Sequence, residues 1–304
     1  MTRKLVSLFL AAALLCAFAP ATAEGGFSVT DMTGREIVLD GPASRIVALT
    51  ASDVEIICAL GADDLLVGRG EYCDWPAEVL EKPVVKSGAE TNLEEILALE
   101  PDVVIMAAMA QTKEQVEALE NAGVKVVVSD AQNLEGVYTA VNLIGAIVGR
   151  STEAAALVKE MQDTFAGISA KAQNTGKTVY FEVSPLQWGL WAAGKGTFMD
   201  ELAGICGLTN AFADVDGWGE VSEEQVLAKD PDFIVTTGMY WGEGPTPVEE
   251  IVGRPGWDGL NAVKNGQVFN ADSNAITRPG PRLMDAAKDL FDFVNGTAEE
   301  DPAA

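Results

Sequence analysis

The stretch NLEEILALEPDVVI at residues 92–105 returns as SEEQVLAKDPDFIV at residues 222–235. Each copy is typical of a short helix that a Pro-Asp pair ends and that a buried strand follows at once. This agreement predicts two similar α/β halves within one chain of 304 residues. The identical pairs are Glu94 and Glu224, Leu97 and Leu227, Ala98 and Ala228, Pro101 and Pro231, and Asp102 and Asp232.

Around both copies, short apolar runs alternate with segments of helical spacing. The runs that predict buried strands are residues 45–49, 65–68, 102–106, 125–129, 178–184, 233–237 and 267–271. The segments that predict helices are residues 52–60, 92–99, 112–122, 134–148, 198–206, 223–229 and 281–295. Such alternation indicates a largely parallel sheet in each half. Residues 27–39 alternate around Thr33-Gly34 and predict a β-hairpin.

A single long helix is predicted between the halves, at residues 151–173, with Ser151 as its N-cap and only Gly167 to interrupt it. We interpret this helix as a rigid connector. The chain then divides into an N-terminal lobe (24–150), the connecting helix, a C-terminal lobe (174–297) and a frayed tail (298–304). The cleft between two such lobes is the default place for a ligand.

Residues 1–23 have the pattern of a signal peptide. Arg3 and Lys4 form a basic start, an apolar run follows, and Ala21-Thr22-Ala23 is a small-residue cleavage site. We therefore expect an exported protein, periplasmic or extracellular. Lipidation at Cys16 is the alternative, and it is disfavoured because Leu15 stands where a lipoprotein signal has a small residue.

The composition excludes several classes of function. Without Arg3 and Lys4, 18 basic residues face 46 acidic ones, a formal charge of −28 that disfavours nucleic acid and anionic membranes as partners. The chain has no His, which excludes His-held zinc or heme and Ser-His-Asp or Cys-His catalysis. Cys58 and Cys206 lie in apolar helical patterns and are expected to be buried thiols, whereas Cys73 lies in a loop and is expected to be exposed.

Glu94 and Glu224 fall in the first turns of the two repeated helices, after the N-cap candidates Asn92 and Ser222. An acid at this position favours the helix dipole, so each residue alone has an ordinary structural explanation. Their occurrence at matching places favours a second interpretation, in which each lobe presents an equivalent exposed acid as a docking point.

Aromatic residues gather in loop-like stretches beside Gly or Pro. These residues are Trp75, Trp188, Trp191, Trp218 and Trp241, accompanied by Tyr72 and Tyr240. A cleft lined by such rings suits a large, flat, partly apolar ligand. Packing over the lobe edges is the alternative for about half of them, and it is expected above all of Trp257.

The motif TRPGPR at residues 277–282 precedes the last helix and carries Arg278 and Arg282. Arginine offers a fixed fork for carboxylate, phosphate or the oxygens of a chelate. We expect Arg278 to contact the ligand and Arg282 to have a structural role, for example with Asp285.

Patterns for catalysis are lacking in the sequence. It contains no Gly-x-Ser-x-Gly motif, no P-loop and no clustered metal ligands. A carboxylate pair of the glycosidase type stays open, because 46 acidic residues always offer pairs.

Taken together, these stretches resemble the periplasmic binding proteins of ABC importers for cobalamin and ferric siderophores. The resemblance covers about residues 28–294. It is carried by TDMTGREIVL, PASRIVALTASDVEIICALGADDLLVG, YCDWP, NLEEILALEPDVVI, VSEEQVLAKDPDFIV, WDGLNAVKNGQVF and RPGPR. It implies two Rossmann-like lobes bridged by one long helix, with the ligand between them and no catalysis.

The resemblance also implies roles for individual residues. Glu94 and Glu224 would dock onto the membrane permease dimer, and Tyr72, Trp218 and Arg278 would contact the ligand. Weaker candidates for ligand contact are Trp188, Trp191, Tyr240 and Trp241. Gly88 departs from the cobalamin branch, where a Trp faces the corrinoid.

The cargo implied by the resemblance is a metal chelate. Cobalamin or a related corrinoid is the first choice, a ferric siderophore is a close second, and heme is third because the chain has no His ligand. Such a ligand brings its own metal, so no protein-supplied metal site and no cofactor are expected. A monomer is expected, and an exported enzyme with an acid pair in the cleft is the competing class.

Overall fold

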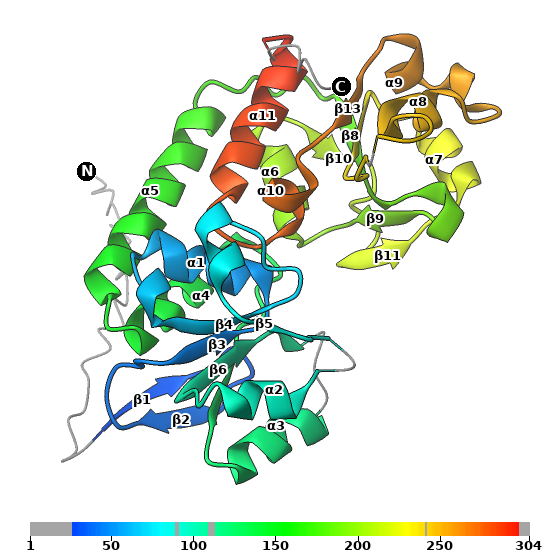
Figure 1. Cartoon of the computed structure of the whole chain (residues 1–304). Helices are drawn as coiled ribbons and strands as arrows, with labels where there is room; N and C mark the ends of the chain where they lie inside the picture. The colour runs from blue at the N-terminus through cyan, green and yellow to red at the C-terminus, as the bar shows by residue number, and fades with distance from the viewer. Residues whose placement is uncertain (1–25, 89–90, 109–112, 241, 298–304) are drawn as a thin grey trace, which may run out of the picture.

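The computed structural model describes residues 26–88, 91–108, 113–240 and 242–297. Two lobes, each built around a β-sheet, are joined by the long helix α5 (Ser151–Ser169) (Figure 1). The predicted signal peptide with Cys16, the tail 298–304 and Trp241 lie outside the described residues. Within the described ranges, no helix is both long and apolar enough to cross a membrane.

The N-terminal lobe contains a five-stranded sheet in the order β5-β4-β3-β6-β7, with every neighbouring pair parallel. Its strands are β3 (Ile46–Ala48), β4 (Leu66–Gly70), β5 (Val84–Val85), β6 (Val103–Met106) and β7 (Lys125–Val128). Its helices are α1 (Ala51–Ala59), α2 (Leu93–Ala98), α3 (Lys113–Asn121) and α4 (Leu134–Ile147). The hairpin of β1 (Phe27–Thr30) and β2 (Glu36–Leu39) packs beside it, as predicted.

The C-terminal lobe contains a mixed sheet in the order β11-β9-β8-β12-β13, in which β10 also pairs with β8. Its strands are β8 (Thr178–Ser184), β9 (Trp191–Ala193), β10 (Thr209–Asn210), β11 (Trp218–Glu220), β12 (Phe233–Thr236) and β13 (Val268–Asn270). Its helices are α6 (Phe198–Ile205), α7 (Glu223–Lys229), α8 (Pro247–Val252), α9 (Asn261–Lys264), α10 (Ser273–Thr277) and α11 (Leu283–Asn295). Strands β8, β12 and β13 are parallel, whereas β9 and β11 are antiparallel additions at one edge.

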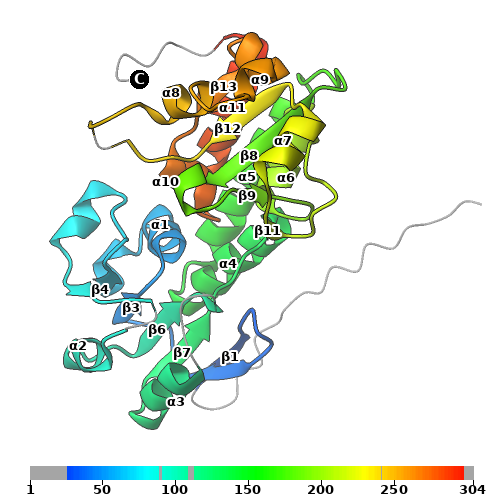
Figure 2. The same ribbon diagram turned by 90° about the vertical axis from the view of Figure 1, so that its right-hand side faces the viewer.

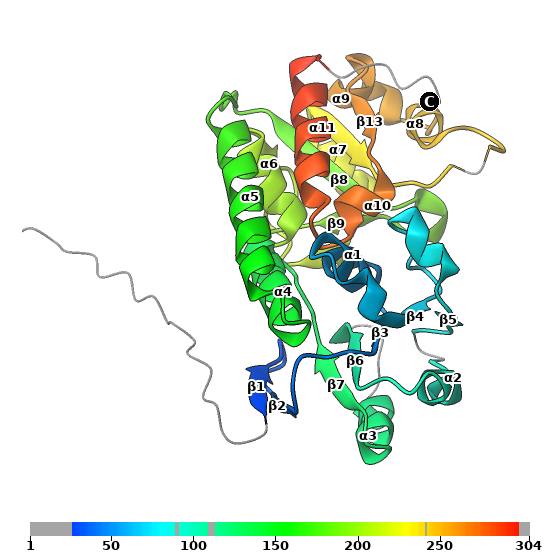
Figure 3. The same cartoon turned by 60° about the vertical axis from the view of Figure 1, so that its left-hand side comes forward.

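Helix α5 runs along one side of both lobes (Figure 3) and packs against α4, α6 and α11. Ala154, Met161, Phe165 and Ile168 form its buried face at helical spacing. This face belongs to one apolar core that continues from the N-terminal lobe into the C-terminal lobe. The connector is therefore fixed to both lobes by packing.

Two details of the predicted connector were wrong. Ser151 is the first helical residue and Arg150 occupies the N-cap position, because α4 ends through Gly149 at φ +67° and the chain turns directly into α5. The helix ends at Ser169 and not at residue 173. Its last turn tightens there, with the Lys171 N–H donating to the Ile168 carbonyl at 2.9 Å.

The repeated stretches adopt the same local structure in both lobes. Glu100 and Asp230, at matching positions, have φ of 49° and 43° and end α2 and α7. The following Asp102 accepts hydrogen bonds from Ser44 at 2.9 Å, and Asp232 accepts one from the Thr178 N–H at 2.8 Å. Each aspartate thereby ties the repeat to the start of a neighbouring strand, β3 in one lobe and β8 in the other.

The three cysteines of the described chain are free. Cys206 is buried, as predicted, whereas Cys58 is only half-buried. Burial raises the pKa of each of the three thiols to about 12. The prediction for Cys73 was wrong, because this residue is fully buried. The Arg69 guanidinium holds the Cys73 carbonyl at 2.8 Å, and Sγ turns inward toward the Ala48 carbonyl.

Candidate functional site

A pocket lies between the two lobes, which Figure 2 shows one above the other. It encloses about 140 Å³. The N-terminal lobe lines it with Thr50, Ser52, Ala107, Ser129, Asp130, Ala131 and Gln132, and the C-terminal lobe with Phe198, Trp218, Thr277 and Pro279. Small-molecule sites usually enclose roughly 300–1,000 Å³. This pocket can therefore hold only part of a ligand of that size, whose remainder would contact side chains around the rim.

The pocket occupies the carboxyl ends of parallel strands. Thr50 follows β3, Ala107 follows β6, and Ser129 follows β7. In the order β5-β4-β3-β6-β7 the chain winds outward in both directions from the pair β3 and β6, and ligands of open α/β sheets bind where the winding direction changes. The predicted cleft site is therefore at the place where the topology favours one.

Trp218 connects the lobes across this pocket. Its indole N–H donates to the Gln132 side-chain oxygen at 3.0 Å, and its ring packs on Phe198 with centroids 5.3 Å apart. The ring is thus fixed in orientation and still lines the pocket, as a platform for an apolar ligand surface would require. Trp218 was predicted to face the ligand, and the structure places it on the wall of this pocket.

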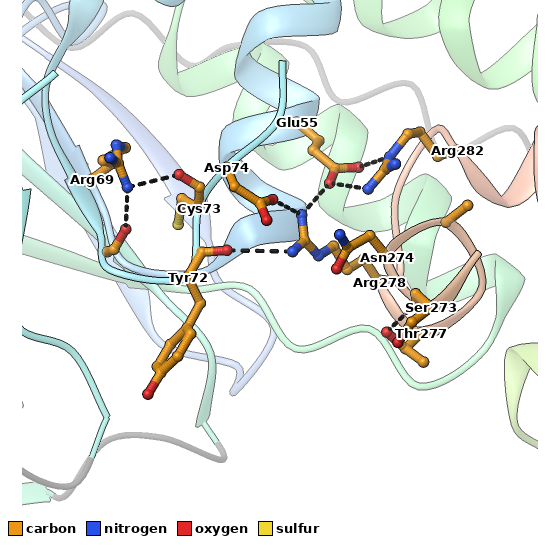
Figure 4. Close-up of polar contacts among 12 residues, drawn as sticks. Glu55, Arg69, Tyr72, Cys73, Asp74, Ser273, Asn274, Thr277, Arg278 and Arg282 are labelled. Atoms are coloured by element: carbon orange, nitrogen blue, oxygen red, sulfur yellow. Dashed lines mark hydrogen bonds and ion pairs between the residues drawn. The ribbon is translucent and has the colours of Figure 1, made fainter. Parts of the chain in front are cut away.

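Arg278 lies beside the pocket, between the lining residues Thr277 and Pro279, but its guanidinium is already paired. Nη1 donates to Glu55 at 2.9 Å and to Asp74 at 2.6 Å, and Nη2 donates to the Tyr72 carbonyl at 3.3 Å (Figure 4). Both carboxylates belong to the N-terminal lobe. Burial opposes ionisation of Asp74, yet its hydrogen bond with Arg278 lowers the pKa of this carboxyl below the usual range.

Arg282 completes the same ion-pair network. Its Nε and Nη2 bind the two oxygens of Glu55, each at 3.0 Å, and Nη1 lies 3.6 Å from Asp272. The structural role expected of Arg282 is therefore present, but its principal partner is Glu55 of the other lobe. Asp285, the suggested partner, pairs with Lys288.

Tyr72 belongs to a loop that is tightly held through its backbone. Arg278 binds its carbonyl, Arg69 binds the next carbonyl, and the ring extends away from both (Figure 4). The ring is 72% exposed, and Trp75 of the same loop packs under the Arg282 guanidinium at 4.9 Å. Gly88 has φ of +93°, a backbone conformation that a residue with a side chain rarely adopts.

The remaining aromatic candidates lie outside the interlobe pocket. Trp188 and Trp191 are 77% and 40% exposed on the C-terminal lobe. Tyr240 lines a second cavity of about 350 Å³ at the carboxyl ends of β8 and β12, together with Gln187 and Glu243. Trp257, of which structural packing was expected above all, is fully buried.

Asp53 is a buried carboxyl directly behind the pocket wall. It lies in the first turn of α1, is 1% exposed, and neither oxygen has a hydrogen bond of normal geometry. Burial raises its pKa to about 7, and the charge of Asp130 adds to the increase. The nearby hydroxyls of Ser129 and Thr50 act in the opposite direction. The wall of the pocket is therefore backed by a group that titrates near neutrality.

Replacing this carboxyl gives a test of its titration. A folded-state pKa of about 7, against 3.8 for an ordinary aspartate, means that the folded chain holds the proton more tightly. The stabilising contribution of this group is therefore lost as pH rises through 7. At about 1.4 kcal/mol per unit, the wild type should lose about 3 kcal/mol between pH 5 and pH 8 relative to Asp53→Asn. Thermal unfolding across this range measures the difference. Parallel curves for the two proteins would contradict the assignment, and the exposed Asp163→Asn variant is the control.

Glu94 and Glu224 are exposed in the first turns of α2 and α7. Asn92 caps α2 by accepting from the Glu94 and Glu95 N–H groups, and Ser222 and Gln225 form a capping box on α7. Both N-cap predictions are confirmed. One turn further, the matched residues Leu97 and Leu227 are 38% and 37% exposed. Figure 1 shows α2 and α7 on the side of the molecule away from α5.

Several pocket residues escaped the sequence analysis, namely Thr50, Ser52, Ser129, Asp130, Gln132 and Phe198. The signal that could have identified the first five is their position at the end of a predicted strand or within three residues after it. Glu55 was also missed, because its partners are distant in sequence. Among the described residues, no group of three or more acids or cysteines is arranged to hold a metal ion.

Comparison with known proteins gives relatives that agree with one another in type. A family profile described as "Periplasmic binding protein" matches residues 46–275. The chain is 34% identical over 275 residues to the uncharacterised ABC transporter substrate-binding lipoprotein YvrC of Bacillus subtilis, covering 88% of this chain and 85% of that protein. It is 30% identical over 257 residues to the vitamin B12-binding protein of Salmonella typhimurium, covering 83% and 91%.

A solved structure supports the same relationship. A possible iron-binding, periplasmic solute-binding protein of Staphylococcus epidermidis superimposes with a TM-score of 0.72 at 31% identity. The alignment covers 83% of this chain and 98% of that one. The two-lobe α/β fold predicted from the repeat is thereby confirmed.

Proposed function

Because the chain belongs to the periplasmic binding protein family, we propose that it is the substrate-binding component of an ABC importer and captures a metal chelate. A corrinoid such as cobalamin is the first choice of cargo and a ferric siderophore the second. The observation that carries the proposal is the interlobe pocket, in which Trp218 and Phe198 face a polar wall at the carboxyl ends of β3, β6 and β7.

The proposal includes the route of delivery. Glu94 and Glu224 dock the loaded protein onto a permease dimer, one acid for each lobe, and the protein acts as a monomer outside the cytoplasmic membrane. Support comes from the exposure of both acids at matching places in the repeat. Outside the membrane the chain would be free after cleavage behind Ala23, or, in the alternative, anchored by a lipid on Cys16.

The competing class, an enzyme with an acid pair, has little support at this site. A single carboxylate, that of Asp130, is among the described residues that line the interlobe pocket. Glu55 and Asp74 are close to it, but both are committed to arginines. We therefore propose binding and delivery without turnover.

Calorimetric titration of residues 24–304 tests this function directly. Cyanocobalamin, a panel of ferric siderophores and heme are titrated separately. Saturable one-to-one binding of cyanocobalamin supports the corrinoid assignment, and binding of a siderophore alone moves the cargo to the second choice. Failure of every chelate to bind contradicts the proposed function.

Trp218→Ala should then weaken binding at least tenfold, because a ring in contact with the ligand is worth about 1–3 kcal/mol and each 1.4 kcal/mol is a factor of ten. Trp188→Ala is the matched comparison. That ring is 77% exposed and lies outside the interlobe pocket, so its loss should change the dissociation constant less than threefold. A reversed order of the two variants would place the ligand elsewhere on the C-terminal lobe.

A further inference from the structure

The interlobe pocket has a negative side chain and no positive one among the described residues that line it. Asp130 supplies a carboxylate, and the other lining groups are hydroxyls, one amide, two aromatic rings, and alanine and proline carbons. The internal segments outside the described ranges, 89–90, 109–112 and 241, contain no Lys or Arg in the sequence. They therefore add no cation to this region.

The two arginines beside the pocket are fully committed. Arg278 and Arg282 share Glu55, which is 3% exposed, and they also face Asp74 and Asp272. Two guanidinium groups against three carboxylates leave a formal charge of −1. An anionic ligand would find no free cation here, and it would have to displace Asp74 from Arg278 to gain one. The displaced carboxylate would then stay nearby.

The second cavity, at the ends of β8 and β12, has the same character. Glu182, Glu243 and Glu250 are among its lining residues, and no Lys or Arg of the described chain lines it. Arg254, behind it, is bound to both Glu182 and Glu250. A ligand that extended over this part of the C-terminal lobe would again meet carboxylates without free cations.

We propose that this site selects metal chelates that carry no net negative charge. Neutral and cationic complexes are accepted, whereas complexes with several exposed carboxylate or catecholate oxygens are rejected. This inference rests on the proposed function and narrows its substrate class. Carboxylates at partly buried positions act through a lower effective dielectric constant than water, so repulsion of an anion a few ångströms away is strong there.

Two ligand series, each of closely similar chelates that carry different charges, test this selection. The first is cyanocobalamin against its derivative in which one propionamide is hydrolysed to a carboxylate. The second is ferrioxamine B, a cation, against its neutral N-acetyl form and its anionic N-succinyl form. In whichever series binds, the anionic member should bind at least tenfold more weakly than the neutral one at low ionic strength. Added salt should reduce the difference, because it screens the repulsion.

Two variants connect the selection to its residues. Asp130→Asn removes the charge from the pocket wall, and Asp74→Asn removes the carboxylate charge that lies 2.6 Å from Arg278 Nη1. Each variant should reduce the ratio of the dissociation constants of the anionic and neutral ligands at least threefold. Asp163→Asn, on the exposed surface of α5, makes the same change of charge and should leave this ratio of dissociation constants unchanged.

The outcomes separate this inference from the proposed function. If chelates bind but the anionic member matches or exceeds the neutral one, the charge selection is wrong and the transport function stands. If no member of either series and no heme binds, whatever its charge, the proposed function is wrong and the selection falls with it. A preference that persists unchanged in both Asp130→Asn and Asp74→Asn would also overturn the assignment to these carboxylates.

Discussion

Uptake should fall at least a hundredfold when Glu94 and Glu224 are both replaced by alanine, while the affinity of the isolated protein for its ligand stays the same. Removing one partner of a buried, hydrogen-bonded charge pair at an interface typically weakens binding by tenfold or more. Two such losses, one at each lobe, act on the same docking event. Each single variant should give an intermediate loss, because the other lobe still docks.

The separation between docking and ligand binding follows from the positions of the two acids. Both are exposed at helix starts, and neither is among the residues that line the interlobe pocket. The Glu224 backbone N–H and the Ser222 hydroxyl lower the pKa of Glu224, so this acid is ionised at neutral pH. The helix caps come from Asn92, Ser222 and Gln225, which the substitutions leave intact.

The measurement is uptake of radiolabelled cyanocobalamin, or of the ferric chelate that binds in titration, by cells in which the variant replaces the native chain. Glu153→Ala/Glu160→Ala is the matched control, since it removes the same charge from two exposed positions on α5. Figure 1 shows this helix on the side of the molecule away from α2 and α7. Undiminished uptake by the Glu94/Glu224 double variant would show that these acids have no role in docking and act only at the helix N-termini. Loss of ligand affinity would place them in the binding site instead.

The repeat was sufficient to predict most of the architecture. A helix stopped by Pro-Asp before a buried strand is a local pattern, and such patterns are readable because hydrophobic periodicity and helix-ending residues act over a few positions. The strands that escaped prediction are β5, β9, β10 and β11, each two or three residues long. A run this short cannot display an alternation, so its pairing depends on the neighbouring strand.

The candidate site was harder to predict than the fold. Trp218 could be proposed from its place in a Gly-rich stretch, and its pocket position agrees with that. Arg278 was predicted to contact the ligand, but nothing local shows that Glu55 binds it from 223 positions away. A chain with 46 acids offers too many possible partners. Burial of Cys73 likewise depends on Arg69 drawing the loop inward, which composition does not reveal.

Removal of the Arg254 side chain is the stability change with the largest expected effect. Arg254 and Glu182 are 2% and 1% exposed, and two hydrogen bonds of 2.7 and 2.8 Å join them. Arg254 also binds Glu250, and its guanidinium lies 4.4 Å from the centre of the Trp257 ring. Arg254→Ala leaves Glu182 buried without a counter-charge, which typically costs about 3–5 kcal/mol.

The loss of stability in Arg254→Ala should be smaller at low pH than at high pH. Burial already raises the pKa of Glu182 despite the hydrogen bonds from Arg254, and removing the guanidinium raises it further. A carboxyl with a raised folded-state pKa is tolerated when protonated and is costly when ionised. Arg254→Ala should therefore be less destabilising at pH 5 than at pH 8. Urea unfolding at the two pH values, with the midpoint and slope fitted separately, measures this.

Two further variants distinguish loss of the ion pair from a general loss of packing. Lys159→Ala breaks an exposed pair with Asp163 on α5 and should cost less than about 0.5 kcal/mol. Glu182→Leu/Arg254→Met replaces the buried pair by apolar groups and should recover most of the stability, because no buried charge remains there uncompensated. If the apolar pair is as unstable as Arg254→Ala, the contact of Arg254 with Trp257 is the stabilising element and the charge of Glu182 is not. Recovery would instead show that the uncompensated charge of Glu182 causes the loss, and that the fold is stable without this ion pair.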